Sequence, residues 1–222
     1  MSRRRPIVSL GLLAVLAASL WSAAPTPGLA RDTGDREPRE PALSRSIGRR
    51  LVTVRGTGSR VGRKNARVRR YLIEIDRRLG IDPDRYADRV EEILSSPRSW
   101  IGGRGVALRR VSHGPVAFRV TLAAPRLTDR LCAPLQTNGI FSCYMRGRSV
   151  LNAMRWRRGA DAYHRDIDGY RAYLVNHEVG HALGHGHRSC PRSGRRAPVM
   201  MQQTKGVRPC VRNPWPLERE RR

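Results

Sequence analysis

The sequence has few lysines, few acidic residues and few aromatic residues for a chain of 222 residues. Only Lys64 and Lys205 are lysines, so nearly all of the 44 basic residues are arginines, and 18 acidic residues leave a net charge of +26. Aromatic residues make up 5% of the chain and no nucleic-acid-binding motif is present, so nucleic acid is not the expected partner. The charge instead favours acidic surroundings, such as an anionic cell envelope or acidic substrates.

The sequence also lacks an apolar run of the roughly 20 residues that a transmembrane helix needs. Its main apolar stretch, from Ile7 to Trp21, follows the positive residues Arg3–Arg5 and precedes small residues that end at Ala30. This order is typical of a secretory signal peptide. We therefore expect residues 1–30 to be removed and the secreted protein to have no integral membrane span; the alternative is an uncleaved anchor.

The rest of the chain divides into a linker, one domain and a tail. Residues 31–50 are rich in proline, glycine and charges of both signs, which predicts a flexible basic linker, with a pro-segment as the alternative. Residues 51–217 have the length of one domain, which we expect to be a monomer. Residues 218–222 are expected to form a charged tail.

Apolar and β-branched residues between turn signals predict several β-strands. Two of them are expected at residues 51–54 and 71–75. Two hairpins are also expected, one from residues 106–111 and 116–123 around Gly114, the other from residues 140–145 and 149–154 around Gly147.

Two helices are predicted among these strands. Asp82-Pro83 is a favourable helix start, and apolar residues recur with helical spacing up to Ser95. A second helix is expected from about Ile167 to Gly184, with one face to pack on a sheet and a neighbouring face toward a cleft. This order of strands and helices predicts an α+β fold.

Residues 177–187, HEVGHALGHGH, contain the pattern H-E-x-x-H. On a helix, residues four apart lie on the same face, so the imidazoles of His177 and His181 can bind one Zn²⁺ ion. Glu178 can then reach a metal-bound water as general base. Because zinc lowers the pKa of such a water to about 7, the motif predicts a zinc-dependent hydrolase.

The third metal ligand is one of two later histidines, His185 or His187. If the helix continued, His185 would lie about 12 Å along it from His177, whereas ligand nitrogens on one ion lie within roughly 4 Å of one another. Gly184 favours a helix end, because glycine readily takes the left-handed conformation that terminates helices. We therefore predict that the chain turns back at Gly184 and that His187 is the third ligand.

The full pattern H-E-x-x-H-x-x-G-x-x-H resembles the zinc signature of the metzincin metallopeptidases, and its sequence is most similar to the matrixin form. A methionine turn follows in that group; residues 197–204 lie where it belongs, with Met200 preferred over Met201 and no proline after it. The chain from about Leu51 to Pro216 also resembles an uncharacterised family of secreted actinobacterial domains. The resemblance implies a zincin-like fold, with a mixed twisted sheet, an N-terminal backing helix, an active-site helix and a short C-terminal part.

The four cysteines suit an exported protein with disulfide bonds. Proximity in sequence favours the pairs Cys132–Cys143 and Cys190–Cys210 among the three pairings that four cysteines allow. The second pair would close a loop around the methionine turn, which stabilises by about 3 kcal/mol in the chain-entropy model. The alternative is a second, structural zinc site that uses Cys190, Cys210 and His185.

The sequence therefore predicts a secreted zinc metallopeptidase, a metalloendopeptidase with a peptide or protein as substrate. A substrate strand is expected to pair with an edge strand near residues 140–145. The alternatives are a zinc amidase that acts on cell-wall peptide and a non-catalytic metal-binding module of the envelope. Glu178 favours catalysis, because a purely structural site has no use for a carboxylate beside an open coordination position.

Overall fold

The computed structural model describes residues 48–222. The predicted signal peptide at 1–30 and residues 31–47 of the predicted linker lie outside the described residues. Within residues 48–222, no helix combines the length and the apolar character that crossing a membrane requires. Arg50, the last residue of the predicted linker, forms an ion pair of 2.6 Å with the buried Asp76, so the ordered domain includes it.

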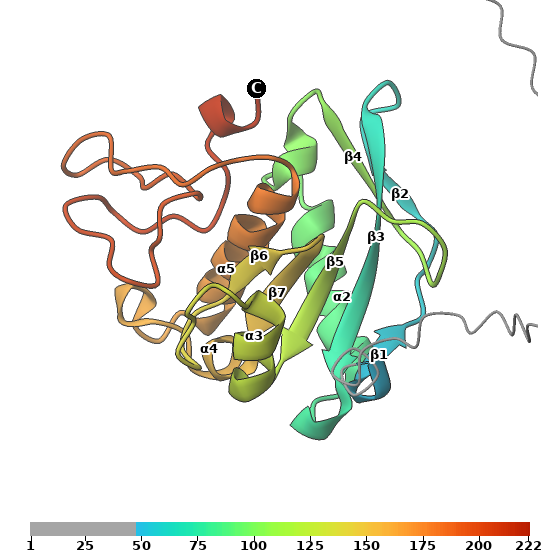
Figure 1. The fold of residues 1–222 in the computed structure, drawn as a ribbon. Helices are drawn as coiled ribbons and strands as arrows, with labels where there is room; N and C mark the ends of the chain where they lie inside the picture. The colour runs from blue at the N-terminus through green and yellow to red at the C-terminus, as the bar shows by residue number, and fades with distance from the viewer. Residues whose placement is uncertain (1–47) are drawn as a thin grey trace, which may run out of the picture. The chain divides into compact units, whose positions relative to one another are not determined.

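Seven strands form one twisted, mixed sheet (Figure 1). They are β1 (Leu51–Val54), β2 (Arg60–Gly62), β3 (Arg67–Asp76), β4 (Val106–Arg110), β5 (Phe118–Ala123), β6 (Cys143–Met145) and β7 (Arg148–Asn152). The strand order is β2-β4-β3-β5-β7-β6, and β1 pairs with β3 as well. Strands β4, β3, β5 and β7 are parallel, whereas β1, β2 and β6 run antiparallel to their partners. The predicted mixed, twisted sheet is confirmed, and the zincin-like fold stays a prediction.

The predicted hairpin of residues 106–111 and 116–123 is wrong. Strands β4 and β5 lie on opposite sides of β3, and both are parallel to it. The registers explain how so short a connection can join two strands on opposite sides of β3. Strand β4 pairs with Arg67–Tyr71, and β5 pairs with Tyr71–Ile75. The chain therefore leaves β4 and crosses β3 at the level of Tyr71 before it continues in the same direction.

The second predicted hairpin forms, but its strands are shorter than expected. Strands β6 and β7 pair in antiparallel register, with Met145 opposite Arg148. Residues 140–142 lie outside the strand. Strand β7 ends at Asn152 and not at Met154, because the Asn152 side chain accepts a hydrogen bond from the Met154 amide at 2.9 Å and begins a helix there.

Both predicted helices form. Helix α2 (Pro83–Ser95) begins at the predicted proline, and the Asp82 side chain accepts hydrogen bonds from the first free amides. Helix α5 (Ile167–Ala182) ends two residues before the predicted end at Gly184. The shorter helices were not predicted; they are α3 (Pro125–Cys132), α4 (Ala153–Arg158), η1 (Arg77–Leu79), η2 (Trp100–Gly102), η3 (Asp161–Tyr163) and η4 (Glu218–Glu220).

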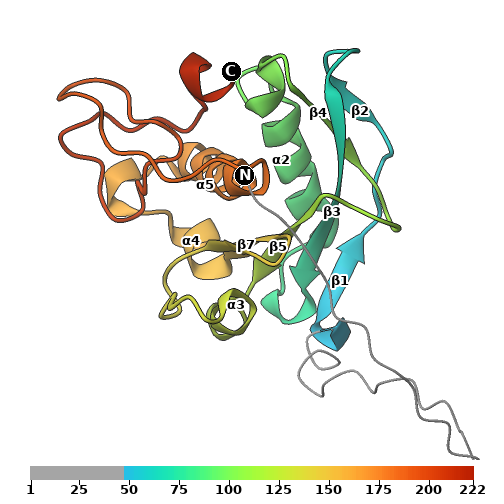
Figure 2. The ribbon, with the colours of Figure 1, turned by 45° about the horizontal axis from the view of Figure 1, so that its top comes forward.

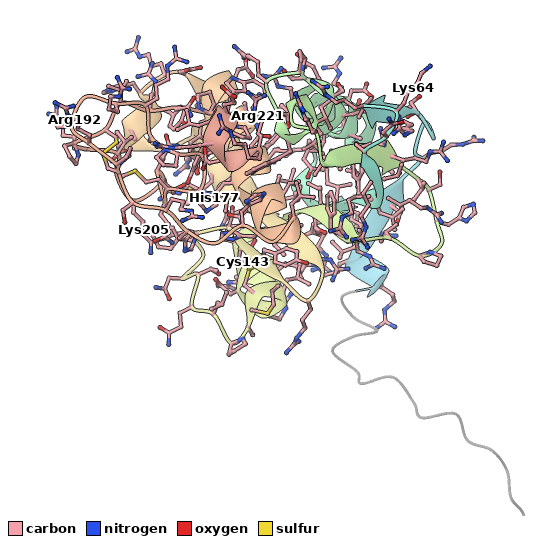
Figure 3. The ribbon with its side chains drawn as sticks, turned by 90° about the horizontal axis from the view of Figure 1, so that it is seen from above. Lys64, Cys143, His177, Arg192, Lys205 and Arg221 are labelled. Atoms are coloured by element: carbon pink, nitrogen blue, oxygen red, sulfur yellow. A yellow bond between two sulfur atoms is a disulfide. The ribbon has the colours of Figure 1, made fainter. Side chains whose placement is uncertain are left out.

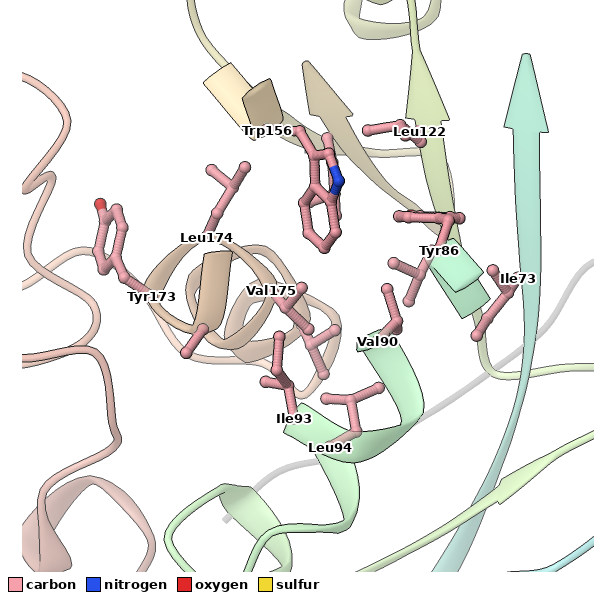
Figure 4. Close-up of a cluster of buried hydrophobic side chains, with 14 of the residues drawn as sticks. Ile73, Tyr86, Val90, Ile93, Leu94, Leu122, Trp156, Tyr173, Leu174 and Val175 are labelled. Carbon is pink, nitrogen blue, oxygen red and sulfur yellow. The ribbon is translucent and has the colours of Figure 1, made fainter. Parts of the chain in front are cut away.

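Helices α2 and α5 pack on one face of the sheet, and α3 packs on the other (Figure 2). Adjacent residues of β7 show the two faces, because Leu151 belongs to the α2 and α5 core and Val150 to the α3 cluster. In the larger core, Val90 and Ile93 of α2 lie close to Val175 of α5 (Figure 4). The helix that carries the histidine motif is therefore fixed from below by the sheet and from one side by α2.

Both predicted disulfides are confirmed. Cys132–Cys143 joins α3 to β6, and Cys190–Cys210 closes a loop in the C-terminal segment. Because both cysteines of that loop are bonded to each other, the alternative of a second zinc site at Cys190 and Cys210 is excluded.

Candidate metal centre

The candidate site lies on α5, whose C-terminal half carries the predicted motif. The helix begins where the Asp166 side chain accepts a hydrogen bond from the Gly169 amide at 2.8 Å. His177 and His181 follow one turn apart on the same face, with ring centroids 4.9 Å apart. His177 is buried at 5% exposure, and His181 is half-buried.

The end of α5 turns the chain back toward these two histidines. Gly184 has a φ of 97°, in the left-handed region that favours glycine. Its amide donates to the His181 carbonyl, and the His185 amide donates to the Gly180 carbonyl, which is the hydrogen-bond pattern of a Schellman motif. The turn places Nε2 of His187 at 3.1 Å from Nε2 of His181. The predicted return of the chain at Gly184 is confirmed.

Three imidazoles meet at this point. One ligand atom from each of His177, His181 and His187 lies within 4.8 Å of the others, so the three can hold a metal ion. The His185 ring instead stacks on the Trp100 ring, with centroids 4.4 Å apart. The structure thus brings together the three histidines that the sequence predicted and keeps His185 out of the group.

Backbone carbonyls orient two of the rings. Nδ1 of His177 lies 2.8 Å from the Val199 carbonyl oxygen. Nδ1 of His181 lies 2.8 Å from the His185 carbonyl oxygen. Because a carbonyl oxygen only accepts, each Nδ1 carries the proton and each Nε2 presents a lone pair to the site.

Burial keeps the three rings neutral. It lowers the pKa of His177 to about 3 and also lowers the pKa of His181 and of His187. At neutral pH all three imidazoles are therefore in the unprotonated form that binds metal ions.

Glu178 is buried beside the histidines at 4% exposure, and its Oε2 has no hydrogen-bond partner among the described residues. Burial raises the pKa of its carboxyl to about 8. A buried carboxyl oxygen without a partner is costly and calls for an explanation. Glu178 also lines a cleft together with the three histidines, so a group bound in that cleft is in reach of the carboxyl.

These residues fit a metal ion such as Zn²⁺. Three imidazole nitrogens are a ligand set of catalytic zinc sites, which keep a fourth position for water or substrate. The unpartnered oxygen of Glu178 provides an acceptor for a group at such a position. Imidazole binds several transition metals, so the choice of zinc belongs to the proposal below.

Met200 lies under the helix, as expected of a methionine turn. Its side chain is 1% exposed, and a Cβ placed on Gly180 would overlap the Met200 sulfur and the Trp100 ring. Met201 is only half-buried. Met200 is therefore the methionine that contacts α5, and its assignment to a methionine turn stays a prediction.

Glu220, from the predicted charged tail, is buried behind the site. It is 8% exposed and accepts hydrogen bonds from the amides of Val199 at 3.0 Å and Met200 at 3.1 Å. The Val199 carbonyl in turn orients His177. Glu220 was not predicted as a buried residue, because a glutamate among arginines near the end of the sequence carries no signal of burial.

Three buried tyrosines fix the segment after Met200. The Tyr173 hydroxyl accepts a hydrogen bond from the Gln203 amide at 2.9 Å, and the Tyr163 hydroxyl donates to the Gln203 side chain at 3.0 Å. The hydroxyls of Tyr170 and Thr204 lie 3.0 Å apart. These contacts fix the position of the segment that contains Gln203 and Thr204.

A cleft of about 530 Å³ opens over the three histidines and Glu178. Its lining includes residues 135–137 and 141–144, which contain part of the edge strand β6. Gln202, Thr204 and Lys205 line it as well. Figure 3 shows His177 and Lys205 on the same side of the molecule.

A helix with three convergent histidines, packed on a mixed sheet and opening into a cleft, defines a protein with a candidate metal centre. The chain belongs to a family described as "Protein of unknown function (DUF3152)", whose model matches residues 39–216. No curated protein and no solved structure matches the chain.

Proposed function

We propose that the protein is a zinc-dependent peptidase with His177, His181 and His187 as metal ligands. The observation that carries the proposal is the buried carboxyl of Glu178, whose Oε2 has no partner among residues 48–222 although it lines the cleft beside three imidazoles. In a purely structural metal site, an unpartnered buried carboxyl would lower the stability of the protein and have no role. The arrangement therefore favours catalysis over a non-catalytic module.

Glu178 is the general base in this proposal. Zinc, when bound, polarises a carbonyl oxygen and makes a water acidic enough to lose a proton near neutral pH. Glu178 takes that proton and passes it to the leaving amine. Its pKa of about 8 without a metal ion, raised by burial, would fall toward neutrality beside a positive charge, in the range where one group serves as base and then as acid.

The cleft suits an extended peptide. Strand β6 is the last strand of the sheet on this side and contributes Cys143 and Tyr144 to the cleft wall. An edge strand offers free backbone groups, with which a substrate strand can pair while its side chains enter the cleft. This pairing would place a backbone carbonyl of the substrate over the three histidines.

We further propose that the protein acts outside the cytoplasm. Its two disulfides suit an oxidising compartment. The large excess of basic over acidic residues favours attachment to an anionic envelope.

The decisive experiment combines zinc analysis with peptide cleavage. Purified protein, with its bound metal quantified, is incubated with a mixed peptide library, and products are identified by mass spectrometry. We expect cleavage that a chelator abolishes and added zinc restores, and no cleavage by a Glu178→Gln variant with the same zinc content. Failure of the fully zinc-loaded protein to cleave any peptide would overturn the assignment.

A further inference from the structure

Lys205 is the only lysine or arginine that lines the cleft within the described residues. Nearly all of the 44 basic residues of the chain are arginines, yet no arginine of residues 48–222 lines the cleft. The only acidic residue there is Glu178, which lies buried on the floor. Among the described residues, Lys205 is therefore the one positive charge in a cleft whose walls are otherwise uncharged.

Among residues 48–222, the Lys205 ammonium has no acidic partner. None of the ion pairs in residues 48–222 includes it. Its Nζ lies 3.3 Å from the Gln202 side-chain oxygen and 5.3 Å from the centroid of the Phe141 ring. The ammonium therefore lies between Gln202 of its own segment and Phe141 of another segment that lines the cleft.

Lys205 lines the same cleft as the three histidines of the candidate metal centre. A substrate group bound to Lys205 would therefore lie in the cleft that holds the bond being cleaved.

We propose that Lys205 selects substrates that place a carboxylate in this part of the cleft. The carboxylate is either an acidic side chain next to the scissile bond or the free C-terminal carboxyl of a short peptide. The inference rests on the proposed function, because it names the substrate class of the same cleft. The apolar stem of a glutamate would lie against Phe141 and the half-exposed Leu135, while its carboxylate reaches the ammonium.

The expected preference is modest, because Lys205 is exposed to solvent. An exposed ion pair changes affinity by roughly fivefold at most, and salt screens it. The preference should therefore be measured at low ionic strength and should shrink in 0.5 M salt.

The test uses hexapeptides of alanine and serine, fluorescently labelled, with one Glu, Gln or Lys at each position in turn. All are amidated, and a further set of Gln peptides keeps the free C-terminal carboxyl. Binding is measured by fluorescence anisotropy on zinc-loaded Glu178→Gln protein, which tests recognition without turnover. Lys205→Ala is compared in this background with Lys64→Ala, which removes the other lysine of the chain. Lys64 is exposed and lies at the opposite end of the molecule from Lys205 in Figure 3.

We expect a Glu peptide or the free-acid peptides to bind roughly fivefold more tightly than their neutral counterparts. The preference should disappear in Lys205→Ala and persist in Lys64→Ala. A position-dependent Glu preference identifies a side-chain site, and a free-acid preference identifies a site for the peptide C-terminus. Equal or absent binding of all peptides, or a preference that survives Lys205→Ala, would overturn the inference.

Cleavage by the protein with Glu178 intact separates this inference from the proposed function. Cleavage without charge preference, and without a change in Lys205→Ala, would leave the peptidase assignment standing and overturn the role of Lys205. Charge-selective binding without any cleavage would support the role of Lys205 and overturn the peptidase assignment.

Discussion

The Glu220 carboxylate accepts a hydrogen bond of 3.0 Å from the amide of Val199, the residue whose carbonyl orients His177. Its second oxygen accepts one from the Met200 amide at 3.1 Å. A residue near the end of the sequence therefore holds, through two peptide groups, the most buried ring of the candidate metal centre. Glu220 does not reach the site itself and acts as a positioning residue.

Glu220→Ala should weaken both the fold and the metal centre. It leaves two buried amides without acceptors, each at a cost of roughly 1–3 kcal/mol. We expect a lower melting temperature and weaker zinc binding in a competition assay with a chelator. Glu218→Ala is the matched control, because its 80% exposed side chain pairs only with the exposed Arg222. Unchanged zinc affinity in Glu220→Ala would show that His177 is oriented without this carboxylate.

His187→Ala and His185→Ala should differ sharply in bound zinc. Both residues follow the same helix end, but only His187 joins the group with His177 and His181. We expect His187→Ala to lose most of its zinc by elemental analysis. His185→Ala should retain zinc, because His185 contributes its backbone carbonyl and its ring stacks on Trp100. The opposite pattern would identify His185, and not His187, as the third ligand.

Glu178→Gln should separate binding from turnover. The amide is close in shape to the carboxylate, so we expect zinc content to remain unchanged by elemental analysis. Loss of a general base should lower kcat by ~10²–10⁴. A variant that keeps its full kcat would remove Glu178 from the mechanism.

The same substitution should change the pH dependence of stability in the metal-free protein. The pKa of Glu178 is about 8 in the folded state, raised by burial from an ordinary value of 4.5. The folded state therefore binds the proton more tightly, and stability is lost as pH rises from 4.5 through 8. We expect the stability gain of Glu178→Gln in urea unfolding to grow over this range, to a few kcal/mol. A gain that is constant with pH would contradict the raised pKa.

His177 gives the opposite slope at lower pH. Its folded pKa is about 3, lowered by burial from 6.5, so the unfolded chain binds the proton more tightly. In metal-free Glu178→Gln protein, stability should therefore fall as pH drops below 6.5, by up to about 1.4 kcal/mol per pH unit for this residue. Urea midpoints at pH 7.5, 6 and 5 test this, and equal midpoints would contradict it.

Gly180→Ala should destabilise the protein although alanine favours helices. The added Cβ would overlap the Met200 sulfur and the Trp100 ring, and overpacking of this kind costs about 1–3 kcal/mol. Gly105→Ala is the control, because a Cβ there meets nothing within 4 Å. Equal melting temperatures for the two variants would show that Met200 moves aside freely.

The sequence predicted the site better than it predicted the sheet. Two local signals were sufficient for the histidine group: the four-residue spacing of His177 and His181 on one helix, and Gly184 as the helix end. Neither depends on distant parts of the chain. The same holds for Asp82, whose side chain caps α2 as its position before a proline indicates.

Features that depend on distant segments were not predictable in this way. Strands β4 and β5 are neighbours in sequence, and only their pairing with Arg67–Ile75 of β3 reveals that they do not pair with each other. Glu220 is buried because the Val199 and Met200 amides lie beside it, about 20 residues away in sequence. Lys205 resembles any other surface cation until the cleft wall is known.

The Cys190–Cys210 bond links the candidate metal centre to the redox state of its surroundings. The loop it closes contains Val199, whose carbonyl orients His177. While the two cysteines remain thiols, this loop lacks a closure that stabilises by about 3 kcal/mol in the chain-entropy model, and His177 loses part of its support. Oxidation and metal affinity are then thermodynamically coupled. A chain with reduced cysteines would bind the ion more weakly than the oxidised chain, so the proposed peptidase would be less active under reducing conditions.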